Sequence, residues 1–304
     1  MNCHFFTIFT VIFDHHFMRM RRYLIYISML FLAFACGQSG IEDRSTIYVS
    51  IAPLKGLVTS IVEDDFEVQV LVPSGASPET FEPSARQLAA LHEARWVFQV
   101  GLIDFETTLL DKLQPADHVV SLHDGVELIA GSCSHGHHHH GAHAHGVDPH
   151  IWTSPRALQQ MATSLYETIH AAYPDSVCYT ANYERLMDDL QALDRRVGER
   201  IAASGIKRVV VYHPALTYYA RDYGIRQDAI EQEGKEPSAR QLATLIREAR
   251  EAGVRAILYQ RQYPRSVVET VAADIGAEAV EFDPLAEDVM ANIDHITDLI
   301  TQQP

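Results

Sequence analysis

The sequence is poor in basic residues and in cysteine. Its 24 lysines and arginines are outnumbered by 40 aspartates and glutamates, which gives a formal net charge of −16 at pH 7. Such a chain has no basic patch for phosphates, so nucleic acid is excluded as a partner and a cation is favoured. Of the four cysteines, only Cys133 and Cys178 lie beyond residue 36, and they do not make a disulfide framework. Cys133 is a candidate soft metal ligand. Cys178 is interpreted as a small packing residue on a helix.

Three familiar catalytic motifs are also missing. His92-Glu93 is followed by Ala-Arg-Trp, so the second histidine of a metalloprotease helix is absent at Trp96. The chain contains neither a Gly-x-Ser-x-Gly elbow nor a Gly-rich phosphate loop. We therefore expect no enzyme, and a hydrolase with a zinc-activated water is the rival class.

Long apolar runs are confined to the N-terminus. Three arginines within residues 19–22 precede an apolar run at residues 23–35. This run is too short to span a bilayer, and a basic segment before a short apolar one is typical of a secretory signal. Because Ala35-Cys36 resembles the cleavage site of bacterial lipoproteins, we expect residues 1–36 to be removed or lipidated. The protein would then be periplasmic or at the cell surface, anchored to the membrane through lipidated Cys36, with plain secretion as the alternative.

Histidine, by contrast, is abundant in the middle of the chain. An eleven-residue run holds seven of them: His135, His137, His138, His139, His140, His143 and His145. Neutral imidazole is a common ligand for transition metals, and a His-rich tract indicates metal binding. Interleaved Gly and Ala give no apolar period, so residues 133–146 are predicted to be a mobile loop that collects metal. A purification tag is the alternative, but tags are normally terminal and uniform.

Elsewhere the sequence alternates between short β-branched runs and amphipathic stretches. The strands are predicted at residues 46–52, 66–72, 96–100, 118–122, 208–212, 256–260 and 278–282. The helices are predicted at residues 54–62, 84–93, 105–113, 156–172, 238–252, 266–275 and 285–301. Strands that alternate with helices of about ten residues indicate parallel sheets covered on both faces.

Residues 174–204 interrupt this alternation with one long helix. Leu186, Leu190, Val197 and Ile201 keep a single apolar face over about 25 residues, a rod of roughly 37 Å at 1.5 Å per residue. The fold class is therefore α/β, with two parallel-sheet lobes at residues 45–173 and 205–304 joined by a rigid helix.

Several polar residues follow the predicted strands at or near their ends. They are Glu79, Glu82, His150, His213 and Asp283. In open α/β sheets, ligands bind at the carboxyl ends of the strands. Taken singly, each residue is an ordinary capping or surface residue. Together, and beside a His-rich tract in an exported chain, they predict a metal site between the lobes.

Five stretches carry a resemblance to a known family. They are residues 73–83, 148–155, 213–224, 233–242 and 283–285. With them the chain resembles the solute-binding proteins of zinc and manganese ABC uptake systems, which include ZnuA-type and adhesin-like metal-binding lipoproteins. The resemblance covers residues 46–302. It implies a monomer that captures a divalent ion between two lobes and passes it to an ABC transporter permease. A surface adhesin or zinc-buffering lipoprotein without a transporter is the alternative.

The resemblance implies a set of four ligands by position. They are Glu79, His150, His213 and Asp283, and Glu79 departs from the histidine that zinc-binding members usually carry. Two imidazoles and two carboxylates suit Zn²⁺, Mn²⁺ or Fe²⁺. The His-rich loop favours zinc, because imidazoles hold zinc much better than manganese. If Glu79 points away, three protein ligands and a water remain.

Overall fold

The computed structural model describes residues 46–113, 118–130, 146–231 and 237–302. All of them belong to one compact unit, Arg44–Pro304. The signal segment, Cys36, Cys133 and the His-rich run lie outside the described residues. None of the described helices is both long and apolar enough to cross a membrane.

The first lobe is built on a parallel sheet in the order β2-β1-β3-β4. Its strands are β1 (Thr46–Val49), β2 (Glu67–Val70), β3 (Trp96–Gln99) and β4 (Val119–Ser121), and its helices are α2 (Ala52–Val62), α3 (Ala85–His92) and α4 (Asp104–Leu109). Val49 of β1 and Phe98 of β3 are fully buried. All four residues of β3 are buried, as expected of a strand covered on both faces, whereas buried and half-buried residues alternate in β1.

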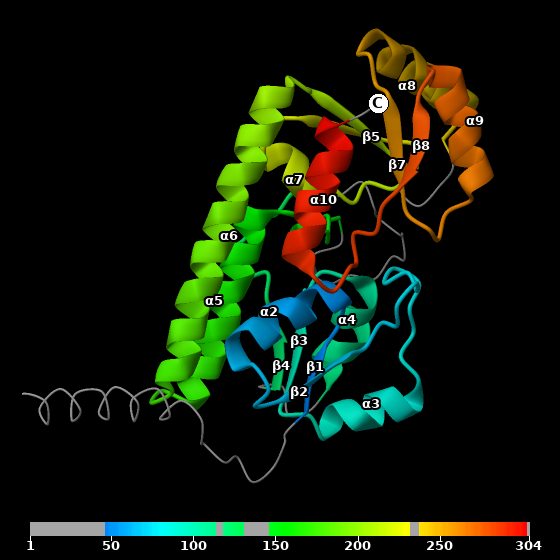
Figure 1. The fold of residues 1–304 in the computed structure, drawn as a ribbon. Coiled ribbons are helices and arrows are strands. Elements are labelled where there is room, and N and C mark those ends of the chain that lie inside the picture. Colours follow the sequence, from blue (N-terminus) through cyan, green and yellow to red (C-terminus); the bar gives the residue numbers. More distant parts are fainter. Residues whose placement is uncertain (1–45, 114–117, 131–145, 232–236, 303–304) are drawn as a thin grey trace, which may run out of the picture. The chain divides into compact units, whose positions relative to one another are not determined.

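The second lobe repeats this arrangement, with a parallel sheet in the order β6-β5-β7-β8 (Figure 1). Its strands are β5 (Arg208–Val211), β6 (Arg226–Ala229), β7 (Ala256–Tyr259) and β8 (Glu278–Glu281), and its helices are α7 (Thr217–Asp222), α8 (Ala239–Glu251), α9 (Arg265–Ile275) and α10 (Val289–Thr301). The sequence did not predict β6 or α7. The sequence of β6 is Arg-Gln-Asp-Ala, a polar edge strand without the apolar alternation that identifies strands.

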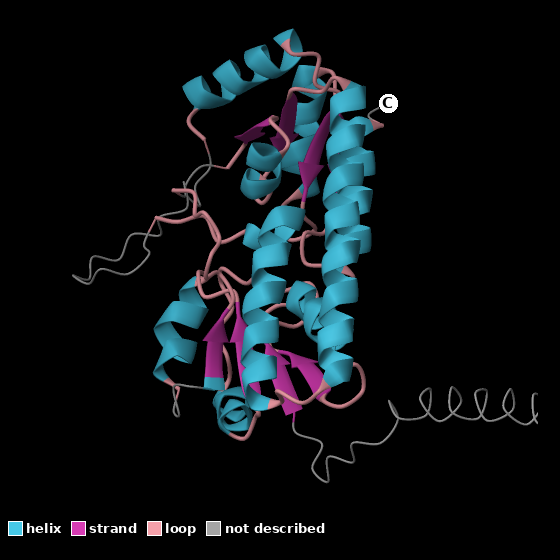
Figure 2. Cartoon of the chain, turned by 90° about the vertical axis from the view of Figure 1, so that its left-hand side faces the viewer, coloured by secondary structure: helices cyan, strands magenta, loops and turns pink. Residues whose placement is uncertain are grey.

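Two neighbouring helices, α5 (Pro155–Ala172) and α6 (Val177–Ser204), pack on each other, and the longer α6 runs alongside both lobes whereas α5 lies beside the first (Figures 1 and 2). The hydroxyl of Ser176 caps α6 by accepting a hydrogen bond from Tyr179, and the helix ends at Gly205 with φ 70°. Its predicted apolar face is buried, with Leu190 and Val197 fully so. The prediction of two α/β lobes and one long helix is confirmed, whereas the exact lobe boundaries stay a prediction.

The last helix, α10, packs on α6 and on α2 of the first lobe. Asp294 of α10 accepts a hydrogen bond from Arg196 of α6 over 2.7 Å. At the start of α10, Lys55 of α2 forms a 2.8 Å ion pair with Glu287. The helix begins four residues later than predicted, because residues 284–288 form the loop that crosses between the lobes. The helix predicted at residues 105–113 ends four residues early, at Leu109, where a 3₁₀ turn follows, and the other predicted elements begin and end within about three residues of those observed.

One prediction about a cysteine is wrong. Cys178 lies near the start of α6 and is disulfide-bonded. Its partner is outside the described residues, which contain no other cysteine. Cys178 is therefore more than a packing residue.

Candidate metal centre

Glu79 reaches the centre from the loop that follows β2. This loop runs from Leu71 to Ser84, where a reciprocal capping box between Ser84 and Gln87 starts α3. Gln87 also donates a hydrogen bond to the carbonyl of Leu71 over 3.2 Å, so the two ends of the loop are tied together. The side chain of Glu79 is 21% exposed, which leaves its carboxylate only partly solvated.

His150 lies just before the single 3₁₀ turn that leads into α5, and Asp148 holds it in place. One carboxylate oxygen of Asp148 accepts hydrogen bonds of 2.9 Å from both the backbone N–H and Nδ1 of His150. Burial opposes the charge on Asp148, but the charge and hydrogen bonds of His150 and a bond from Thr217 lower the pKa of that carboxyl overall. With Nδ1 carrying the proton, Nε2 of His150 is the free donor atom. Glu82, which the sequence also offered among the polar residues near strand ends, is exposed.

Hydrogen bonds of two aromatic side chains also hold the turn that carries His150. The hydroxyl of Tyr218 donates to the carbonyl of Asp148 over 2.8 Å and accepts from the N–H of Ile129. The indole N–H of Trp152 donates to the carbonyl of Pro284 over 2.9 Å, and both Trp152 and Tyr218 are almost completely buried. These aromatics therefore pack in the core and also fix the position of His150.

His213 comes from the second lobe, two residues beyond β5. Its Nδ1 lies 3.1 Å from Oε2 of Glu231, and its Nε2 lies 2.8 Å from Oε1 of Glu79. Burial disfavours the charged imidazole, but the hydrogen bonds and charges of the two glutamates outweigh it and raise the pKa of His213 to about 9. The ring of Tyr263 stacks on His213 at a centroid distance of 5.6 Å.

Three of the four predicted ligands meet at one point. The donor atoms of Glu79, His150 and His213 all lie within 4.8 Å of one another. The two Nε2 atoms are 3.3 Å apart. Two nitrogens that bind one tetrahedral zinc at 2.0–2.1 Å are separated by about 3.4 Å, so the histidines already have the spacing that an ion requires. Glu79 Oε1 is 4.0 Å from Nε2 of His150.

Asp283 does not join this cluster. It is exposed, and its carboxylate accepts a 2.8 Å hydrogen bond from the backbone N–H of Leu285. Its own carbonyl accepts from the side chain of Asn292 over 2.7 Å. Both contacts shape the crossing loop before α10, so its role as a ligand stays a prediction.

The space at the cluster is small. The cavity lined by Glu79, His150 and His213 measures about 20 Å³, and Ile103, Trp152, Gln260 and Tyr263 also line it. A volume of 10–15 Å³ is needed for a single water, so this cavity admits one guest of about that size. The centre therefore fits an ion.

Glu231 is the residue at the centre that the sequence did not reveal. It stands two residues past β6, as His213 stands two residues past β5, and Glu231 N–H donates to the carbonyl of Tyr212 over 2.8 Å. A carboxylate at the carboxyl end of a strand is the signal that identified the other candidates. It was hidden because the polar strand β6 itself was not predicted.

The fold and the centre together define a class of protein, the two-lobed α/β binding proteins with an ion-sized site at the carboxyl ends of the strands. A family model described as "ZnuA: Zinc-uptake complex component A periplasmic" matches residues 47–302, and the chain belongs to this family. The resemblance stated from the sequence is thus confirmed.

Individual relatives agree with this assignment. The zinc-binding lipoprotein AdcA of Streptococcus pneumoniae is 27% identical over 287 residues, which cover 88% of this chain but only 56% of the relative. The chain thus spans little more than half of that protein. The high-affinity zinc uptake system protein ZnuA of Bacillus subtilis is 28% identical, with 81% of this chain and 82% of the relative covered.

Solved structures show the same fold. A crystal structure of a ZnuA deletion mutant with zinc bound has a TM-score of 0.77 and 32% identity, covering 86% of this chain and 98% of that one. The periplasmic zinc-binding protein TroA of Treponema pallidum, at 18% identity and a TM-score of 0.73, covers 86% of this chain and 99% of its own and shares the fold.

Proposed function

We propose that this protein acts outside the cytoplasm, where it binds one divalent metal ion, zinc, between its two lobes. It would then deliver the ion to the membrane permease of an ABC transporter. The convergence of Glu79, His150 and His213 within 4.8 Å carries the proposal. Each histidine presents Nε2 because a carboxylate occupies Nδ1, which is the usual arrangement at zinc sites. Relatives named as a zinc-binding lipoprotein and as part of a zinc uptake system support both the ion and its delivery.

Zinc is favoured over manganese by the donor set. Two imidazoles and one carboxylate form the three-ligand core of many zinc sites, whereas manganese prefers more oxygens. Asp283 would add a second carboxylate if its loop moved toward the cluster, and this would shift the preference toward Mn²⁺ or Fe²⁺. The choice of ion therefore depends on the fourth ligand.

A zinc hydrolase is the rival function. Its organic substrate would need a cleft open to the ion, but the described cavity at the three donor atoms holds only about 20 Å³. A larger hollow of about 560 Å³ lies nearby and is lined by Asp148 and Glu231. None of the three ligands lines it, so a substrate there would face the carboxylates behind the histidines. This geometry favours a binding protein.

The other parts of the chain take auxiliary roles in this proposal. The signal segment would export the protein, and lipidated Cys36 would anchor it as a monomer at the membrane. The His-rich run from His135 to His145 would collect zinc near the central site. The helix α6, which contacts α2 of the first lobe and α10 after the second sheet, would limit the lobes to small movements.

A titration of the metal-stripped protein without residues 134–146 tests the proposal. Zinc should bind with 1:1 stoichiometry, and excess Mn²⁺ should not displace it, as read by calorimetry and thermal shift. Binding by the full chain should show the same tight site plus weaker ones. If the shortened protein has no tight site, the proposed function is wrong. If manganese displaces zinc, the protein is a manganese or iron receptor.

A further inference from the structure

The amide of Gln260 is buried at the wall of the metal centre. Its side chain is 1% exposed, and its Oε1 has no hydrogen-bond partner among the described residues. Buried polar groups are nearly always paired, because an unpaired one loses its hydration without compensation. A buried oxygen that no described residue pairs, at the wall of a cavity of this size, indicates a guest in the cavity as its partner.

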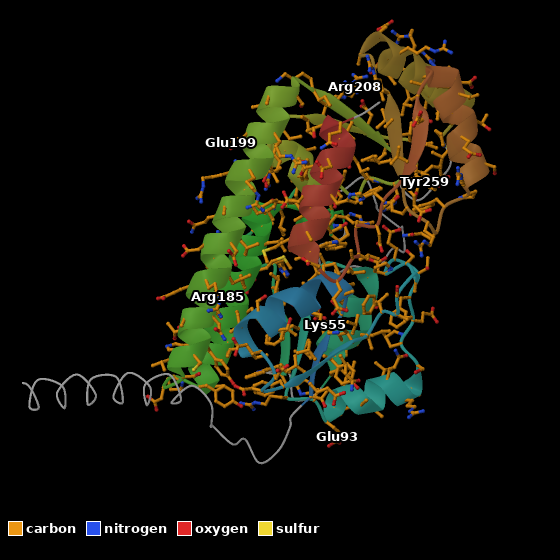
Figure 3. All side chains as sticks on the ribbon, viewed as in Figure 1. Lys55, Glu93, Arg185, Glu199, Arg208 and Tyr259 are labelled. Atoms are coloured by element: carbon orange, nitrogen blue, oxygen red, sulfur yellow. The ribbon has the colours of Figure 1, made fainter. Side chains whose placement is uncertain are left out.

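Gln260 lines the same small cavity as His213, and the two residues come from neighbouring strands. In the pairing of β5 with β7, Val211 lies opposite Leu258, and Tyr212 donates to the carbonyl of Leu258 over 2.8 Å. His213 and Gln260 follow just past the ends of β5 and β7, and both line the small cavity at the cluster. Tyr259, labelled in Figure 3, is the last residue of β7 and directly precedes Gln260.

Among the described residues, the cluster of metal-ligating side chains has three members and no fourth. Glu79, His150 and His213 supply three, and a protein zinc site without an open position uses four. Asp283 is exposed and its carboxylate is engaged by Leu285. The cavity of about 20 Å³ has room for one atom-sized guest, which leaves little space for an ion together with a water.

We propose that Oε1 of Gln260 is the fourth ligand of the bound ion, in place of Asp283. The proposal rests on the proposed function, since it needs an ion at the three-donor cluster. A neutral carbonyl oxygen adds a donor without adding charge. The centre would then hold the ion with two imidazoles, one carboxylate and one amide oxygen. In the metal-free protein the same oxygen has no partner among the described residues, so Gln260 would lower the stability of the metal-free fold while it strengthens metal binding.

Gln260→Leu tests this assignment, with Gln262→Leu as the matched control. Gln262 lines the same cavity from an exposed position. We expect Gln260→Leu to weaken zinc binding by at least about tenfold, the lower bound for altering the surroundings of a metal ligand. It should also change the visible spectrum of the Co²⁺-loaded protein, because the number of ligands falls. The metal-free variant should melt about 2 °C or more higher than wild type, because the unpaired amide is gone. Gln262→Leu should change none of these.

Two other results would overturn the assignment. One is wild-type zinc affinity and an unchanged Co²⁺ spectrum in Gln260→Leu. The other is a lower melting temperature with unchanged affinity, which would make Gln260 an ordinary packing residue. Gln260→Glu is the second variant, because it keeps the shape of the side chain and an oxygen donor. It should bind zinc at least as tightly as wild type, so a loss of binding in Gln260→Leu alone would not come from misfolding. Failure of wild type itself to bind zinc would instead refute the proposed function.

Discussion

Nδ1 of His213 lies 3.1 Å from Oε2 of Glu231, and this contact determines which nitrogen of the ring is left for a metal. A carboxylate can only accept, so Nδ1 keeps its proton and Nε2 faces Glu79. Asp148 does the same for His150 in the first lobe. Each lobe therefore contributes one histidine together with the carboxylate that orients it.

Removing the charge of Glu231 should weaken the site without unfolding the protein. Glu231→Gln keeps an acceptor for Nδ1 but loses the negative charge that raises the basicity of the ring. We expect zinc affinity to fall by about tenfold, at the low end of the effect of such partners, in a competition titration against a chelator. Glu248→Gln is the control, because Glu248 lines the same hollow and contacts Arg208 and no histidine. Equal losses in both variants would contradict a specific role for Glu231.

Zinc affinity should depend on pH up to about 9. The pKa of His213 is raised to about 9, so near pH 7 the metal-free protein carries a proton that zinc must displace. Apparent affinity should rise about tenfold per pH unit from 7 to 9 and then level off, with about one proton released on binding. Calorimetry in buffers of different ionisation enthalpy measures that proton. An affinity that is constant over this range would show that His213 is already neutral.

The same shift makes a prediction for the metal-free protein. A histidine whose pKa is raised from 6.5 to about 9 on folding stabilises the fold fully below pH 6.5. This contribution is lost as the pH rises from 6.5 to 9, so the melting temperature of the metal-free protein should fall over that interval. In Glu231→Gln the fall should be smaller. A larger fall in that variant would contradict the assignment of the shift to this pair.

Replacing the carboxylate at residue 79 should change the selectivity of the site. Glu79→His gives three imidazoles, which favour zinc over manganese more strongly than two imidazoles and a carboxylate do. The ratio of zinc to manganese affinity should rise by tenfold or more in a competition titration. Glu82→His is the control, because Glu82 is exposed and outside the cluster. An unchanged ratio in Glu79→His would mean that residue 79 does not bind the ion.

Replacing two helical glycines by alanine tests whether α2 packs tightly against the loop that contains Glu287. A Cβ on Gly56 would meet the carbonyl oxygen of Glu287 at 2.9 Å, whereas one on Gly198 would meet only the ring of Tyr223 at 3.8 Å. Gly198→Ala should stabilise α6 by about 0.5–1 kcal/mol, since glycine is costly inside a helix. Gly56→Ala should instead lower the melting temperature, because backbone cannot move aside easily. Equal gains in both variants would show that the approach of Glu287 to α2 is loose.

The sequence by itself determined the alternation of strands and helices, the long helix and the order of the lobes. These features follow from local periodicity and caps, such as the apolar face of α6 and the serine before α3, and local patterns can be read from the chain. The candidates Glu79, His150 and His213 were also readable, because each follows a strand or a proline turn and the family resemblance fixed their positions. Their roles as ligands remain a proposal.

Only the tertiary structure decided which of these residues meet. Glu79 and His213 are far apart in sequence, and their 2.8 Å contact depends on how the two lobes pack along α6 and α10. Glu231 was hidden because β6 is too polar to be recognised, and Gln260 because only its burial in the cavity wall distinguishes it from a surface glutamine. Asp283 looked equivalent to the other candidates, yet its carboxylate is used by the loop before α10. Distances between elements depend on packing of the whole chain, which no local pattern encodes.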